Sequence, residues 1–458
     1  MTEVLLTAPE GETLPVLLVA DGDLGGLSPF EQGLAAVAEF KGKAGQLLVV
    51  PGADGRTARV LFGLGDPAKT EAMLFRGLAP RLAAGDYRLD GLPERLDPTQ
   101  VATAFALGGY RFDRYRKKGQ AKARLVVPAG ADVAEARETA HACDLARDMV
   151  NTPANDMGPL QIETIAREIA ERHGATVSVV TGDALLDENY PSIHAVGRAA
   201  DPARAPRIIE LGWGRPGAPL VALVGKGVVF DTGGLDIKPS AGMRLMKKDM
   251  GGAAHVLALA RMIMAAELPV RLAVLVPVVE NAISGDAMRP GDVLNTRKGL
   301  TVEVGNTDAE GRLILSDALT RAGELDPALT IDMATLTGAA RIALGPQVIP
   351  FFTDDETLAD EIAAASRAVN DPLWRLPLWA GYEEALDGDV ADLKNDPDGW
   401  AQAGSVTAGL FLKRFAPPGP WVHLDIFAWN PKGRPGYPVG AEAQAVRALF
   451  AMIRTRFA

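Results

Sequence analysis

Apolar residues near the N-terminus alternate between short β-rich runs and longer stretches with helical spacing. The β-rich runs predict strands at 47–51, 58–65 and 124–128. The helical spacing predicts helices at 67–85 and 98–116. This alternation predicts a small α/β domain over residues 1–130.

A longer helical pattern follows, and it separates the first part of the chain from the rest. From 132 to 149, apolar residues recur at intervals of three and four. The pattern ends at Asn151-Thr152-Pro153, because proline and its preceding residue disfavour helix. A second helix is expected at 160–173, ending before Gly174. We interpret residues 131–174 as a helical bridge between two domains.

The remainder, residues 175–458, alternates strands and helices more strongly. Near-continuous apolar runs predict buried strands at 221–230, 270–280, 300–305 and 329–335. Helical patterns predict helices at 249–267, 314–324, 355–369, 403–415 and 440–457. The pattern therefore predicts a larger C-terminal α/β domain with a central mixed, largely parallel sheet covered by helices. In such a sheet the active site lies beyond the carboxyl ends of the strands.

Composition restricts the class of protein and its partners. The chain has 458 residues, 48% of them hydrophobic and 23% charged, which is typical of a globular protein of two or three domains. The formal net charge of -11 makes nucleic acid an unlikely partner. The single cysteine excludes an internal disulfide, no secretory signal is visible, and the most apolar stretch is too short for a bilayer. We therefore expect a cytoplasmic protein that does not bind membranes.

The first segment with candidate chemistry is GKGVVFDTGGLDIKPSAGMRLMKKDMGGAAH, residues 225–255. Asp231 directly follows a predicted strand, so its carboxylate is expected at the end of the sheet. Asp249 begins a helical pattern and has the alternative role of helix N-cap. Lys226 and Lys238 lie among apolar residues, although either lysine is also compatible with an exposed side chain.

The second segment is GNTDAEGRLILSDAL, residues 305–319, which also follows a predicted strand. In extended backbone, Asp308, Glu310 and Arg312 would face the same side. Taken alone, this pattern favours a capped turn, with Asp308 as the cap and Arg312 in the first turn of a helix.

Together the two segments place four carboxylates near the predicted strand ends of one sheet. Clustered carboxylates are costly to bury without cations, and two divalent ions would balance their charge. Oxygen ligands suit magnesium, manganese or zinc without choosing among them. The five histidines show no spacing typical of a zinc site.

The sequence resembles the leucine aminopeptidase family, the M17 metallopeptidases. The octapeptide NTDAEGRL at 306–313 looks like the family signature, and GKGVVFDTGG with the following IKP and MKKDMGGAA is similar to its other metal-binding block. YRFDRY at 110–115, NTPAN at 151–155 and DMATLTGA at 332–339 match as well. The resemblance covers roughly residues 100–458.

The resemblance implies a residue-by-residue assignment of the site. The implied metal ligands are Lys226, Asp231, Asp249, Asp308 and Glu310, with Asp231 and Glu310 bridging two Mn, Zn or Mg ions. Lys226 as a ligand requires a neutral amine, so its pKa is expected to be depressed by burial and metal. Lys238 would be catalytic and stabilise the oxyanion. Arg312 would hold a bicarbonate ion acting as general base.

The resemblance also implies the substrate and the assembly. Met246, Thr335 and Gly338 match residues that line the pocket for the substrate's first side chain, and a Met-lined pocket favours Leu and Met. We therefore expect a two-metal aminopeptidase that acts on short peptides and forms a homohexamer, with residues 175–458 as its catalytic domain.

Two features of the sequence depart from the family pattern. Asp236 stands where the family usually has serine, and it could perturb Lys238 or simply face solvent. The tail around Phe427, Ala428 and Trp429 is atypical and could narrow the specificity pocket.

Parts of the sequence are also compatible with two other functions. A two-metal phosphoesterase would suit clustered acids equally well on chemistry alone. A DNA-binding or scaffolding role is disfavoured by the acidic charge and the complete ligand set.

Overall fold

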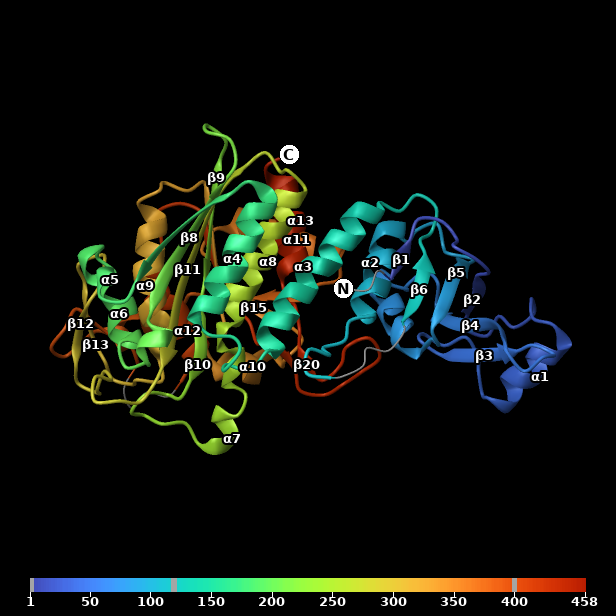
Figure 1. Cartoon of the computed structure of the whole chain (residues 1–458), viewed down its shortest axis with the longest axis horizontal. Coiled ribbons are helices and arrows are strands. Elements are labelled where there is room, and N and C mark those ends of the chain that lie inside the picture. The colour runs from blue at the N-terminus through green and yellow to red at the C-terminus, as the bar shows by residue number, and fades with distance from the viewer. Residues whose placement is uncertain (1–3, 117–121, 398–401) are drawn as a thin grey trace. The chain divides into compact units, whose positions relative to one another are not determined.

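The computed structural model describes residues 4–116, 122–397 and 402–458. The chain divides into two compact units, one comprising residues 1–144 and 430–439 and the other residues 145–429 and 440–458. The division falls inside the predicted bridge 131–174, so the domain boundaries proposed from the sequence stay a prediction. The α/β class predicted from the sequence is confirmed, as both units pair helices with a mixed sheet (Figure 1).

The smaller unit contains a six-stranded sheet in the order β1-β6-β5-β2-β4-β3. All neighbouring pairs are parallel except β3 with β4. The strands are β1 (Leu5–Leu6), β2 (Leu14–Ala20), β3 (Leu47–Pro51), β4 (Thr57–Gly65), β5 (Gly85–Asp90) and β6 (Ala123–Val126). The helices are α1 (Pro29–Val37), α2 (Pro98–Gly108) and the 3₁₀ turns η1 (Ala72–Gly77) and η2 (Ala79–Arg81).

Two helical predictions for this unit need correction. The helix predicted at 67–85 is wrong, since this segment forms the short turns η1 and η2 and then enters β5. Pro80 offers a physical reason, because proline lacks the amide that would continue an α-helix through this segment. The helix predicted at 98–116 ends at Gly108.

The larger unit is built on a nine-stranded mixed sheet in the order β16-β15-β18-β14-β9-β11-β8-β7, with β10 paired to β11. The run β18-β14-β9-β11 is parallel, whereas β8 and β7 are antiparallel to their neighbours. The strands are β7 (Thr176–Thr181), β8 (Arg207–Trp213), β9 (Leu220–Gly225), β10 (Gly227–Asp231), β11 (Arg271–Asn281), β14 (Leu329–Ala334), β15 (Ile349–Phe352), β16 (Leu373–Arg375) and β18 (Trp421–Asp425).

Helices cover both faces of this sheet (Figure 1). On the central strands, α8 packs with α4 and α13 beside it, while α9 packs with α6 and α12 beside it. The helices of the chain from α3 onward are α3 (Val133–Asn151), α4 (Pro159–His173), α5 (Ala184–Asp187), α6 (Pro191–Gly197), α7 (Ser240–Met243), α8 (Gly251–Ala265), α9 (Glu310–Gly323), α10 (Gly338–Leu344), α11 (Glu356–Ala368), α12 (Gly404–Lys413) and α13 (Val446–Arg456), with further 3₁₀ turns η3 (Pro202–Arg204), η4 (Met246–Met250) and η5 (Ala380–Leu386). Two short strands, β19 (Trp429–Asn430) and β20 (Gly440–Ala441), complete the chain.

The start of α8 approaches the central strands closely enough to require glycine. A Cβ on Gly252 would lie 2.1 Å from the carbonyl oxygen of Met333 and 2.7 Å from the amide nitrogen of Lys226. The amide of Ala253 donates to the carbonyl of Lys226 at 2.8 Å. This approach brings the residues before α8 to the carboxyl ends of β9 and β14.

Two strand predictions for the larger unit are also corrected. The single strand predicted at 221–230 is broken at Lys226, where the Lys226 amide still donates to Met333 of β14 at 3.0 Å but its carbonyl accepts from the Ala253 amide of α8 at 2.8 Å. The strand predicted at 300–305 belongs to a separate sheet made of β12 (Val293–Asn295), β13 (Thr301–Glu303) and β17 (Leu393–Lys394). The four candidate carboxylates therefore do not all follow strands of one sheet.

Candidate metal centre

The candidate site is assembled from residues at the ends of five different segments. Lys226 lies in the break between β9 and β10, and Asp231 ends β10. Asp249 lies in η4, directly before α8. Asp308 lies in the loop after β13, and Glu310 is the first residue of α9. The fold thus gathers side chains that are up to 84 positions apart, between Lys226 and Glu310.

Lys226 joins two of the carboxylates. Its Nζ lies 2.8 Å from Asp249 Oδ2 and 3.0 Å from Glu310 Oε1, and all three side chains are buried. Gly311 makes this approach possible, because a Cβ there would lie 2.6 Å from Lys226 Nζ. Both alternative roles are excluded, since Lys226 is not an exposed lysine and the N-cap of α8 is Met250 rather than Asp249.

Lys238 joins the other two carboxylates. Its Nζ lies 2.8 Å from Asp231 Oδ2 and also contacts Asp308 Oδ1. The Lys238 side chain is 14% exposed and that of Asp308 is 32% exposed, whereas Asp231 is buried. The site therefore has an accessible side at Lys238 and Asp308, where a substrate can reach it.

Three carboxylates are close enough to share metal ions. Ligand oxygens of Asp231, Asp308 and Glu310 all lie within 4.8 Å of one another. In the part of the chain that the structure describes, this is the one group of three or more His, Cys, Asp or Glu side chains with such geometry. All of its members are carboxylates.

The carboxylates oppose one another's ionisation. Burial raises the pKa of Glu310 to about 8, with Asp231 adding to the shift and Lys226 reducing it. Burial and Asp231 likewise raise the pKa of Asp308 to about 6, against the effect of Lys238. Added positive charge would therefore be strongly favoured here.

The pKa of Lys226 is shifted in the opposite direction to the one expected from the sequence. Burial opposes its charged form, yet Asp249, Glu310 and Asp231 together hold its pKa above the usual range. The depressed pKa predicted for Lys226 is thus not produced by the protein groups alone. A neutral Lys226 ligand requires the positive charge of bound ions.

The donor set fits divalent cations. Four carboxylates face two ammonium groups, which leaves the cluster with a net charge of -2 when all are ionised. Among the described residues, the buried Oε2 of Glu310 has no hydrogen-bond partner. A buried carboxylate oxygen without a partner is costly, and a hard cation would satisfy it.

Arg312 lies on α9, and its side chain is buried. Its Nη1 donates to the carbonyl oxygen of Asn395 at 2.7 Å, and no described residue accepts a hydrogen bond from its Nε. The extended arrangement of Asp308, Glu310 and Arg312 predicted from their spacing is wrong, because Glu310 and Arg312 are helical. The alternative of a cap by Asp308 is also wrong, since the N-cap of α9 is Ala309.

Buried asparagines that the sequence reasoning missed position the ligand loops. Asn281, the last residue of β11, donates from Nδ2 to Asp231 Oδ1 at 2.8 Å and to the Thr307 carbonyl at 3.1 Å. On the other side of the same loop, Asn395 Nδ2 donates to the Asn306 carbonyl at 2.7 Å. The signal in the sequence is a polar residue directly after a predicted strand, which Asn281 shows and Asn395 does not.

Asp236 ties the two ligand-bearing segments together. Its Oδ2 accepts hydrogen bonds from the Thr307 amide at 2.8 Å and from Thr307 Oγ1 at 3.1 Å. Its own amide donates to Thr307 Oγ1 at 2.8 Å. Asp236 therefore does not pair with Lys238; the residue is exposed, but its carboxylate is held by Thr307 and orients the residue before Asp308.

Replacing Asp236 with alanine is expected to weaken Mn²⁺ binding by about 10-fold, since outer-sphere partners of metal ligands contribute 10- to 100-fold. Isothermal titration of the metal-free protein measures this affinity. The variant Asp236→Asn keeps one acceptor oxygen and should recover most of it, while Asp360→Ala removes an exposed acid of α11 and serves as the charge control. An unchanged affinity in Asp236→Ala would show that the contact to Thr307 is dispensable.

The predicted pocket residues lie beside this cluster. Thr335 Oγ1 donates to Asp249 Oδ1 at 2.8 Å, and Met246 begins η4, which contains Asp249. Gly338 is the first residue of α10. The loop between Thr335 and Gly338 is held by Asp425, which accepts from the amides of residues 336 and 337 at 2.9 and 3.1 Å. These contacts place the three pocket residues at one edge of the candidate centre.

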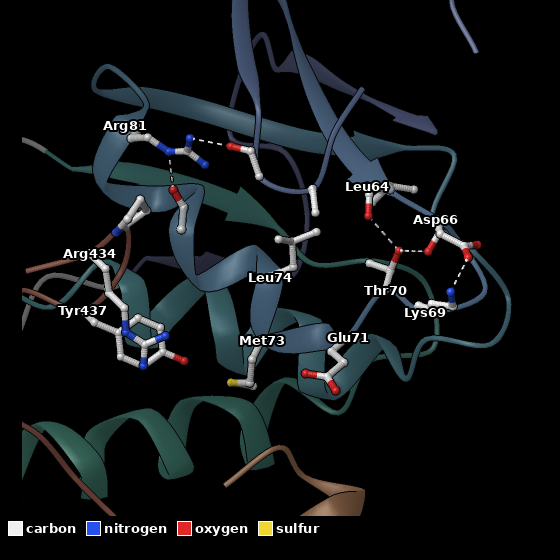
Figure 2. A pocket seen from close by; sticks show the side chains of 14 residues that line it. Leu64, Asp66, Lys69, Thr70, Glu71, Met73, Leu74, Arg81, Arg434 and Tyr437 are labelled. Atoms are coloured by element: carbon white, nitrogen blue, oxygen red, sulfur yellow. Dashed lines mark hydrogen bonds and ion pairs between the residues drawn. The ribbon is translucent and has the colours of Figure 1, made fainter. Parts of the chain in front are cut away.

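A separate pocket of about 670 Å³ lies within the smaller unit (Figure 2). Two carboxylates line it, Asp66 and Glu71, and Asp66 pairs with Lys69 at 3.6 Å. Arg81, another lining residue, donates to the Gly45 carbonyl at 2.7 Å. This lining offers fewer acids than the cluster in the larger unit, so the cluster remains the candidate for metal chemistry.

None of the described helices combines the length and the apolar character that crossing a membrane requires.

Comparisons with known proteins show the family of the chain. The family model described as "Cytosol aminopeptidase family, catalytic domain" matches residues 144–450, and "M17 aminopeptidase, N-terminal domain" matches residues 22–128. A probable cytosol aminopeptidase of Syntrophotalea carbinolica is 39% identical over 447 residues, which cover 90% of this chain and 89% of the relative.

Solved structures are similar over nearly the whole chain. A cytosol aminopeptidase from Coxiella burnetii has a TM-score of 0.93 and 43% identity, covering 99% of this chain and 100% of its own. The bottromycin maturation enzyme BotP, in complex with Mn, has a TM-score of 0.88 and 36% identity, covering 97% and 99% respectively.

Proposed function

Since the chain belongs to the M17 cytosol aminopeptidase family, whose members are exopeptidase hydrolases, we propose that it releases N-terminal residues from short peptides by a two-metal mechanism. The observation that carries the proposal is the convergence of four carboxylates on Lys226 and Lys238. A complex of the related BotP with Mn supports the choice of a divalent metal. For this chain we propose manganese or zinc, with magnesium as the alternative.

The proposed ligands are the residues assigned from the sequence: Lys226, Asp231, Asp249, Asp308 and Glu310. When bound, the ions would supply Lewis acidity, lowering the pKa of water and polarising the scissile carbonyl. The substrate's free α-amine would also bind to ions held by these residues, which explains a restriction to N-terminal residues. Asp231 and Glu310 are proposed to serve both ions, as the family resemblance implies, and their ligand oxygens lie within 4.8 Å of each other.

Lys238 is proposed as the residue that stabilises negative charge on the carbonyl oxygen during attack. Its ammonium group is partly accessible, and Asp231 and Asp308, against the effect of burial, hold its pKa above the usual range. Lys238 is therefore positively charged at neutral pH, as charge stabilisation requires.

Arg312 is proposed to hold a bicarbonate ion, whose chemistry at this position is that of a general base. Its buried guanidinium uses Nη1 for Asn395 and leaves Nε free for an anion. The planar guanidinium suits a bidentate oxyanion.

Met246, Thr335 and Gly338 are proposed to line the pocket for the first side chain, with Leu and Met as favoured residues. The support is that Thr335 hydrogen bonds to Asp249 and that Met246 belongs to the same turn. A flexible thioether adapts to branched and unbranched apolar side chains.

We also propose that the protein is cytoplasmic and assembles as a homohexamer. Family membership supports both statements, and the names of the relatives support the first. Several large apolar side chains of the larger unit are exposed, including Ile342, Trp374 and Trp379, which suits a surface covered by self-association. The net charge of -11 continues to disfavour nucleic acid as a partner.

Hydrolysis of leucine p-nitroanilide tests the proposal. We expect activity to disappear when the purified protein is treated with a chelator and to return when Mn²⁺ or Zn²⁺ is added. Activity should follow the metal content because bound metal ions lower the pKa of water and so supply a hydroxide nucleophile near neutral pH. Hydrolysis of a phosphoester without hydrolysis of any aminoacyl anilide or dipeptide would instead support a phosphoesterase.

A further inference from the structure

Two positively charged side chains lie near one aromatic ring beside the proposed substrate pocket. Lys248 Nζ lies 5.2 Å from the centroid of the Phe427 ring, and the guanidinium carbon of Arg341 lies 5.2 Å from the same centroid. Lys248 follows Met246 by two residues in η4, and Arg341 lies one turn after Gly338 in α10. The ring thus brings together cations from the two segments that carry pocket residues.

Neither cation has an acidic partner. Within the described residues, Lys248 and Arg341 form no ion pair and no hydrogen bond through their side chains, although Asp249 and Asp425 interact with Lys248 electrostatically. Lys248 is only 6% exposed, so its ammonium group has lost most of its water. A buried charge without a partner is unfavourable, and a carboxylate supplied by a ligand would compensate it.

The two carboxylates that interact electrostatically with Lys248 are already engaged elsewhere. Asp249 pairs with Lys226 at 2.8 Å and accepts from Thr335 at 2.8 Å. Asp425 accepts hydrogen bonds from the backbone and side chain of Thr337. The positive charge of Lys248 and Arg341 is therefore available to a ligand.

Phe427 is held in place by the atypical tail of the chain. Gln444 Oε1 accepts hydrogen bonds from the amides of Phe427 and Ala428 at 3.1 and 2.7 Å. Ala428 adopts a φ of 56°, in the left-handed region that non-glycine residues rarely occupy. Gln444 is itself anchored, since its amide donates to the buried His255 Nε2 at 3.0 Å. The ring is therefore held in place beside both cations.

We infer that Lys248, Arg341 and Phe427 form a carboxylate-binding end of the pocket for the first side chain, so that the enzyme also removes N-terminal glutamate. The inference rests on the proposed function. The apolar stem of a glutamate side chain would pack against Met246 and Phe427, as that of leucine or methionine would. Its carboxylate would then meet the two cations. The side chain of glutamate is one methylene longer than that of aspartate. Its carboxylate is therefore better placed to reach positive charges at the far end of an apolar pocket.

The test compares glutamyl and glutaminyl p-nitroanilides, which differ in charge but hardly in shape. In the Mn²⁺-loaded wild-type enzyme, kcat/KM for the glutamyl substrate is expected to exceed that for the glutaminyl substrate by about 10-fold, as one charge-assisted contact provides. In Lys248→Met and in Arg341→Met, this ratio should fall towards 1. Both substrates are measured on the same variant. A general loss of activity lowers both values of kcat/KM equally and leaves their ratio unchanged.

Conservative and remote variants serve as controls. Lys248→Arg and Arg341→Lys keep the charge and should restore part of the ratio. Arg367→Met removes an exposed arginine of α11 and should leave the ratio unchanged.

Three outcomes overturn the inference. A wild-type ratio near 1 would do so, and so would a wild-type ratio that persists in both methionine variants. If the variants instead change the preference for Leu-Gly over Leu-glycinamide, the cations bind the peptide's C-terminal carboxylate and the side-chain assignment is wrong. Failure of the proposed function is distinguishable, because the loaded enzyme would then hydrolyse none of these aminoacyl substrates.

Discussion

Replacing Glu310 with alanine is expected to abolish peptide hydrolysis, with kcat/KM lower by more than about 100-fold. Loss of an outer-sphere partner alone costs 10- to 100-fold, and Glu310 is a proposed ligand of both ions. Its two carboxylate oxygens are buried, and Oε2 has no partner among the described residues, so no neighbouring group can replace it. Steady-state hydrolysis of leucine p-nitroanilide at saturating Mn²⁺ measures the loss.

The same substitution should leave the fold intact. Glu310 is 1% exposed, and burial raises its pKa to about 8. The ionised carboxylate therefore contributes little to the stability of the metal-free protein. Lys226 keeps its pair with Asp249 at 2.8 Å in the variant. We therefore expect the melting temperature in chelator to stay near that of the wild type, while the increase caused by Mn²⁺ disappears.

Asp308→Ala should show the same two effects, because Asp308 belongs to the same group of ligand oxygens. Glu168→Ala, an exposed position on α4, controls for removal of a carboxylate. Wild-type turnover in either ligand variant would refute the metal assignment.

The proposed ligands Asp231, Asp308 and Glu310 could be singled out in the sequence because each lies at a break in an apolar pattern. Asp231 follows a buried strand, and Asp308 and Glu310 precede an apolar helix. The spacing of these residues did not predict the backbone conformation that joins them. Helix α9 begins at Glu310, so Asp308, Glu310 and Arg312 do not share the extended conformation that was expected.

The supporting contacts could not be predicted for a different reason. Asn395 and Asp308 are 87 positions apart, and Asn395 reaches the loop only because β17 pairs with β13. Similarly, the role of Asp236 depends on a hydrogen bond to Thr307, 71 positions away. Such pairings follow from the topology of the chain and leave no periodic signal along the sequence.

Replacing Lys238 with alanine is expected to lower kcat by about 10²- to 10³-fold, the cost of removing one group that stabilises the oxyanion. KM for leucine p-nitroanilide should change little, because the proposed contact strengthens only in the transition state. Initial-rate measurements over a range of substrate concentrations separate kcat from KM.

Metal binding distinguishes this role from that of a ligand. Lys238 pairs with Asp231 and Asp308, so its removal leaves these carboxylates with less positive charge, and Mn²⁺ should bind at least as tightly as in the wild type. The Mn²⁺-induced rise in melting temperature should therefore persist in Lys238→Ala, whereas Glu310→Ala loses it. Lys432→Ala, at an exposed position, controls for the loss of one positive charge. If Lys238→Ala loses metal binding together with activity, or raises KM alone, Lys238 organises the site or binds substrate and does not stabilise the transition state.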